Sequence, residues 1–141
     1  MRTVDFHAYG HPNVIGKHKT TLEITTEEEL TSRGTCIIGV RATQTLRDFD
    51  DEIKTLAKST RTQIQLTMSV DGLVERVLGR GSPGLTYSDS TSMVARTSSF
   101  ECGRTVMVGA DRVASDLGRR FVQKLRDPDI VIKCQLSYAK R

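Results

Sequence analysis

Two of the chain's three histidines lie in one short stretch, GHPNVIGKHKTT, at residues 10–21. An imidazole can accept and release a proton near neutral pH, and a neighbouring carboxylate can orient the ring and stabilise its charge. Aligning the two halves of the chain places His18 opposite Asp89, so we expect these side chains to meet in a cleft as candidates for acid–base catalysis. His11, in the turn before Pro12, is the third candidate.

The same residues have a structural interpretation, in which a half-buried His–Asp contact only fastens the two halves together. A metal site has less support: His11, His18 and Asp89 would form a ligand set only if the turn lay over the strand. The cysteines form no CxxC pair and are far apart: Cys36, Cys102 and Cys134. We therefore expect no metal and no cofactor.

The sequence also carries features that suit anion binding. GHPN and GRGSPG, at residues 79–84, are turns stiffened by proline, and such turns can present backbone N–H groups to an anion. Arginines recur every seven residues from 112 to 126, which on a helix would form one basic stripe. The alternatives are tight connections that need glycine, a solvated helix face, or contact between this helix and an acidic one in a homodimer. The ligand-binding candidates are Gly10, Asn13, Thr20, Arg80, Gly81, Ser82, Thr91, Arg112, Arg119 and Arg126.

Strands and two helices must position these residues. Strands are predicted where apolar and polar residues alternate or where apolar residues form a short run. Six segments after the first turn show one of these patterns. The segments are 20–25, 33–42, 62–70, 73–79, 90–96, 104–110, with a last strand at 129–138. The dipeptide DG at residues 71–72 predicts a hairpin. Apolar residues at helical spacing predict helices over 45–58 and 111–128.

The order strand, strand, strand, helix, strand occurs twice. A shift of 68 residues aligns CIIGVRA with RTVMVGA, and a shift of 71 aligns GHPNV with GSPGL. We therefore predict one domain, residues 1–141, with pseudo-repeats at about 4–70 and 73–138 around a pseudo-twofold axis. The fold class is α+β, mainly β, as a sandwich or a barrel. The alternative is that any two strand–helix–strand units would align about as well.

Several motifs together resemble an archaeal family known only as a domain of unknown function. They are the GHPN turn, the His-x-Thr-Thr strand, the Gly-x-Cys-Ile-Ile-Gly-Val strand and the helix start Ala-Asp-Arg-x-Ala-x-Asp-Leu. The resemblance covers nearly the whole chain. It implies an archaeal, cytosolic, mostly β protein of one domain, and it implies no activity.

Composition narrows the function classes. No apolar run is long enough to cross a membrane and no signal-peptide core is present, so we expect a cytoplasmic protein without a membrane partner. The net charge of +4 permits contact with nucleic acid. We expect binding of RNA or another phosphate-bearing polyanion through the basic helix and the glycine-rich turns. The alternative is a small hydrolase or transferase acting on a phosphate-bearing substrate at His18 and Asp89. The sequence does not decide whether the protein is an enzyme.

Overall fold

The structure is a computed structural model that describes residues 1–141. It is built mainly from strands, and in the long ones buried side chains alternate with more exposed ones. In β4 (Thr62–Val70) every second side chain is buried, as its apolar alternation predicts. This strand lies in a first sheet with the order β1-β8-β4-β5. The other strands of this sheet are β1 (Arg2–Tyr9), β5 (Leu73–Arg80) and β8 (Val131–Lys140).

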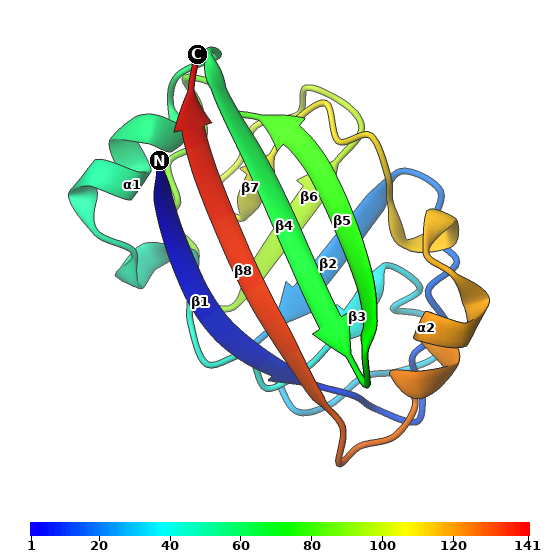
Figure 1. The fold of residues 1–141 in the computed structure, drawn as a ribbon. Helices are drawn as coiled ribbons and strands as arrows, with labels where there is room; N and C mark the ends of the chain where they lie inside the picture. Colours follow the sequence, from blue (N-terminus) through cyan, green and yellow to red (C-terminus); the bar gives the residue numbers. More distant parts are fainter.

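A second sheet lies behind the first and has the order β3-β2-β6-β7 (Figure 1). Its strands are β2 (Thr21–Thr25), β3 (Ile37–Gly39), β6 (Ser92–Arg96) and β7 (Thr105–Met107). Apolar side chains of both sheets form one buried cluster of 34 residues. The molecule is therefore mainly β with two four-stranded sheets, and it is not a closed barrel.

The first helical region is shorter than the predicted helix at 45–58. It divides into a 3₁₀ turn, η1 (Leu46–Asp48), and a helix, α1 (Asp51–Ala57). Thr45 and Asp50 cap these two pieces through their side-chain oxygens. Phe49 interrupts the helix because its backbone is extended, with φ −67° and ψ 150°.

The second helical region divides in the same way. The 3₁₀ turn η2 (Ala114–Asp116) precedes a helix of six residues, α2 (Arg119–Lys124). Leu117 between them is extended, with φ −66° and ψ 143°. The predicted helix over 111–128 is therefore wrong for most of its length.

The two halves of the chain make matching strand contacts. Exchanging β1 with β5, β4 with β8, β2 with β6 and β3 with β7 leaves both strand orders unchanged. In the parallel pairs, Glu23 lies opposite Ile37 and Val94 opposite Thr105, and each pair shifts register at the next residue. These positions correspond at the offsets of 71 and 68 found in the sequence. The matches support the duplication hypothesis, which a superposition of residues 36–68 on 104–136 would test.

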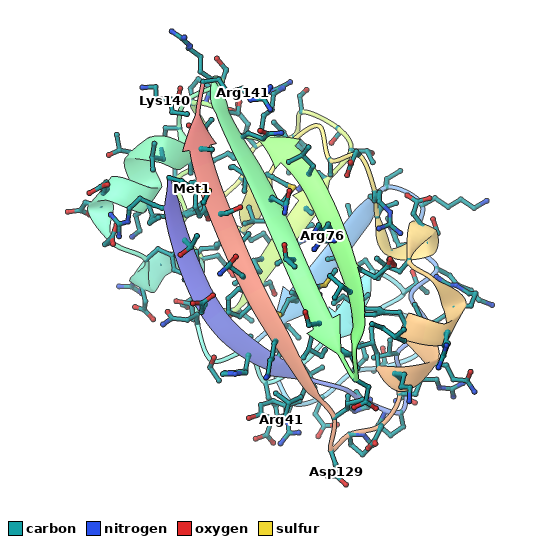
Figure 2. All side chains as sticks on the ribbon, in the orientation of Figure 1. Met1, Arg41, Arg76, Asp129, Lys140 and Arg141 are labelled. Atoms are coloured by element: carbon teal, nitrogen blue, oxygen red, sulfur yellow. The ribbon has the colours of Figure 1, made fainter.

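Helices α1 and α2 lie on opposite sides of the molecule (Figure 1). Neither crosses the outer face of the first sheet, where Arg76 projects from β5 (Figure 2). None of the helices combines the length and the apolar character that a membrane span requires. The chain after β1 runs to α2, and that contact forms the site described next.

Candidate functional site

A surface cleft of about 480 Å³ lies between α2 and the segment that follows the GHPN turn. Its lining includes three cationic side chains, from Lys17, Arg119 and Arg126, and no carboxylate. Neutral polar groups come from Asn13, Ser32 and Gln123. A concave surface lined by charges of one sign concentrates the electric field and attracts ions of the opposite sign.

The positive charge of the cleft has no counterion within the protein. The four ion pairs in the structure involve Arg2, Arg112 and Lys124, and none involves a cation of the cleft. Nε of Arg126 donates to the carbonyl oxygen of Pro12 at 3.2 Å, while its other nitrogens make no hydrogen bond within the chain. Arg126 and Lys17 can therefore donate hydrogen bonds to an external anion.

Arg119 holds the cleft together. Its Nη2 atom donates to the carbonyl oxygens of Gly16 at 2.9 Å, Leu117 at 3.0 Å and Ala114 at 3.2 Å. These bonds tie the segment before β2 to the start of α2. Since carbonyl oxygens carry no net charge, the arginine still contributes a full positive charge to the cleft.

The GHPN turn packs against the end of α2. The N–H groups of Gly10 and His11 donate to the carbonyl oxygens of Ile130 at 3.3 Å and Leu125 at 2.8 Å. A Cβ atom at Gly10 would overlap the carbonyl oxygens of Leu125 and Asp127. Glycine is therefore required here for close packing, and these two N–H groups are not free to bind an anion.

The second glycine-rich turn packs against α1 in the same manner. The N–H groups of Gly81 and Ser82 donate to the carbonyl oxygens of Thr62 at 3.0 Å and Ala57 at 2.9 Å. Arg80 lines a separate, smaller cavity of about 170 Å³. These three candidates therefore lie apart from the cleft at α2.

The antiparallel pairing of β2 with β6 separates His18 from Asp89. Thr21 lies opposite Arg96, and Thr25 lies opposite Ser92. His18 precedes β2 and Asp89 precedes β6, so the two residues lie at opposite ends of the strand pair. The predicted His18–Asp89 pair is wrong, and no group of three or more residues in the structure could hold a metal ion.

Each of these two side chains instead closes its own turn. Nδ1 of His18 accepts hydrogen bonds from the N–H groups of Thr20 at 3.3 Å and Thr21 at 3.2 Å. Oδ2 of Asp89 accepts them from Thr91 at 3.0 Å and from the next residue at 2.7 Å. Short polar side chains commonly bond to the backbone two or three residues ahead in this way. The candidates Thr20 and Thr91 therefore belong to two separate turns.

The predicted basic stripe is also wrong. Residues 112–118 are not part of α2, so a spacing of seven does not align their side chains with Arg119 and Arg126. Nη2 of Arg112 donates to both carboxylate oxygens of Glu75 at 3.1 Å and to the carbonyl oxygen of Asp116 at 2.9 Å. Arg112 thus has a structural role away from the cleft.

Three residues of the cleft with polar or charged side chains are absent from the sequence-derived candidates: Lys17, Ser32 and Gln123. The strand was predicted over 20–25 and β2 spans Thr21–Thr25, so Lys17 lies in the connection before the strand. Gly16, with φ +60°, was the available signal of a turn before Lys17. No such signal marks Ser32, because a contact between two loops places it at the cleft. In that contact Nδ2 of Asn13 donates to the carbonyl oxygen of Leu30, two residues before Ser32, at 2.7 Å.

Comparison with known proteins agrees with the resemblance noted in the sequence. A relative in the archaeon Methanocaldococcus jannaschii is an uncharacterised protein that is 40% identical over 120 residues, which covers 85% of this chain and 88% of the relative. A family model for a domain of unknown function (DUF371) matches residues 6–139. The chain therefore belongs to the DUF371 family.

Proposed function

We propose that the protein binds phosphate-bearing ligands in the cleft between residues 12–17 and α2. The observation that carries this proposal is the convergence of Lys17, Arg119 and Arg126 without a carboxylate. Like charges held close together repel each other, and a bound anion would relieve that repulsion. Phosphate is a suitable anion because it accepts several charge-assisted hydrogen bonds at once.

The size of the cleft supports a compact ligand group. Small-molecule sites usually have volumes of about 300–1,000 Å³, and this cleft has about 480 Å³. It has room for a small phosphorylated molecule or for one nucleotide unit of an RNA. Gln123, Ser32 and the side-chain oxygen of Asn13 could then contact the uncharged part of the ligand.

We do not propose the hydrolase or transferase alternative. Its catalytic pair, His18 and Asp89, lies at opposite ends of the β2–β6 strand pair. No imidazole and no carboxylate is among the residues that line the cleft.

The test is a calorimetric titration at low salt with two probes, pyrophosphate and a short single-stranded RNA. A charge-assisted hydrogen bond contributes about 1.5–3 kcal/mol, so Lys17→Gln and Arg126→Gln should each weaken binding by about tenfold or more. Both side chains are exposed, so thermal unfolding should change little. Arg119 is unsuitable for this test because it also supports the local fold.

Lys58→Gln is the matched control, since Lys58 and Arg126 correspond at the offset of 68 residues and both follow a helix closely. It should leave binding unchanged. The proposal fails if the wild type binds neither probe, or if the control loses as much affinity as Arg126→Gln. Preference between the probes identifies the ligand class. If the protein contacts several phosphates of an RNA, its affinity for RNA should fall steeply as the salt concentration rises.

A further inference from the structure

The turn of the second half that corresponds to GHPN already holds an anion, the carboxylate of Glu101. Oε2 of Glu101 accepts hydrogen bonds from the hydroxyl of Ser82 and from the N–H of Gly84, the latter at 2.6 Å. These bonds, first that from Ser82 and then that from Gly84, lower the pKa of Glu101 below its ordinary value. The turn around Pro83 is therefore an anion receptor filled by a side chain of the same chain.

The two turns have the same backbone hydrogen bonds. Four N–H groups of each turn donate to backbone carbonyls at positions that correspond between the halves. The corresponding donors are Gly10 and Gly81, His11 and Ser82, Val14 and Leu85, and Lys17 and Ser88. The N–H of Asn13 consequently occupies the place that the N–H of Gly84 occupies in the second turn.

In the first turn, the ring of His11 takes the position of the anion. The N–H of Asn13 donates to Nδ1 of His11 at 3.0 Å. A neutral imidazole that accepts through Nδ1 carries its proton on Nε2, whereas an imidazolium donates from both nitrogens and accepts through neither. Protonation of His11 would therefore break this bond and release the N–H of Asn13.

We propose that the oxyanion of the ligand binds to the N–H of Asn13 and that protonated His11 donates to the same oxyanion, as Ser82 does to Glu101. This inference rests on the proposed function of the cleft, which Pro12 and Asn13 line. His11 precedes these two residues and lies just outside the lining. One proton from solvent is taken up at Nδ1 when the ligand binds. The bond from Asn13 to His11 is then replaced by one bond from each group to the ligand.

The charges around the turn couple the proton to the anion. The charged groups on the segments packed against it are Lys17, Glu29, Arg119, Arg126, Asp127 and Asp129. None of them forms an ion pair with His11. An anion bound at the N–H of Asn13 would attract the positive charge of a protonated ring. By linkage, each event then favours the other.

Sulfate is the probe for this test, because its charge stays constant while imidazole titrates between about pH 5 and pH 8. Calorimetry in two buffers of different ionisation enthalpy counts the protons taken up on binding. The wild type should take up about one proton, and its affinity should rise by up to about tenfold for each unit by which the pH falls. His11→Ser, which copies the second turn, should bind sulfate without this dependence on pH.

His18→Gln is the control, and it should keep the dependence on pH that the wild type shows. The inference is overturned if the wild type takes up no proton, or if His11→Ser keeps the same dependence. The proton count on the wild type needs no variant, so loss of stability in His11→Ser leaves the test intact. Failure of the proposed function looks different, because Lys17→Gln and Arg126→Gln would then bind pyrophosphate as the wild type does.

Discussion

The three cysteine side chains lie in three different electrostatic environments. Burial raises the pKa of Cys134 to about 12. Burial and then the nearby carboxylate of Glu23 raise the pKa of Cys36. At Cys102 burial also acts upward, but hydrogen bonds from Thr105, the backbone and Arg96 outweigh it and lower the pKa.

These directions predict the order of thiol reactivity. The thiolate is the nucleophile, so a lowered pKa increases its fraction at neutral pH. Cys102 should therefore react first with iodoacetamide, Cys36 more slowly, and Cys134 only after unfolding. Mass spectrometry of the labelled peptides measures this order at a series of pH values. Arg96→Gln should slow labelling of Cys102, and equal rates at Cys36 and Cys102 would contradict the prediction.

Two pairs of corresponding residues have a left-handed backbone, and in each pair only one residue is glycine. Gly16 at φ +60° corresponds to Tyr87 at φ +51°, and Gly109 at φ +60° corresponds to Arg41 at φ +53°. A residue other than glycine costs about 1–2 kcal/mol in this conformation. Specific contacts offset the cost: the hydroxyl of Tyr87 donates to a buried backbone carbonyl, and Arg41 lies over an aromatic ring.

At the scale of the elements, the contact between each glycine-rich turn and a helix is a stringent packing requirement. Gly10→Ala should destabilise the protein by about 1–3 kcal/mol or more, because its Cβ would meet the backbone oxygens of Leu125 and Asp127, which cannot move aside cheaply. Chemical denaturation measures the change in the free energy of unfolding.

Gly118→Ala is the matched control for Gly10→Ala. Gly118 has φ −55°, and the nearest atom to an added Cβ would be a Glu75 carboxylate oxygen at 3.8 Å. Alanine fits there and reduces the entropy of the unfolded chain, but it is a weaker N-cap for α2 than glycine, so stability should change by less than about 1 kcal/mol. Equal losses from both substitutions would show that close packing is not the reason for glycine at position 10.

The strands were more predictable than the helices for a physical reason. A period of two follows directly from one buried face, and β4 and β8 show it clearly. Phe49 and Leu117 have helical spacing in the sequence, yet both are extended and buried beside a short helix. Spacing records which residues face the core, and it does not distinguish a continuous helix from a 3₁₀ turn followed by a helix.

The candidate site was predictable only in part. Asn13, Arg119 and Arg126 were identified for anion binding, and they do line one cleft. The reason given for the arginines, a helical stripe, was wrong. Alignment of His18 with Asp89 did not predict their distance, because residues that correspond between two repeats lie close only when they are near the axis that relates the repeats. Distance from that axis depends on strand direction, which the alignment does not contain.

At the scale of the whole molecule, the two halves exchange contacts instead of folding side by side. The first sheet places β8 between β1 and β4, and the two glycine-rich turns each pack on the helix of the other half. Fragments 1–71 and 72–141, produced separately, should therefore lack a native monomeric fold and should regain β-sheet circular dichroism when mixed. A first fragment that unfolds cooperatively as a monomer would contradict this.

The position of β8 also sets when the chain can fold during synthesis. β1 has no other partner in its sheet, and β4 has β8 along one side, yet β8 comes last in chain order. Until that strand is available, β1 has no neighbour in its sheet and one edge of β4 remains open to other chains. Sheets built from such distant segments form slowly. A first half that lacks β8 therefore presents open strand edges, which favour aggregation.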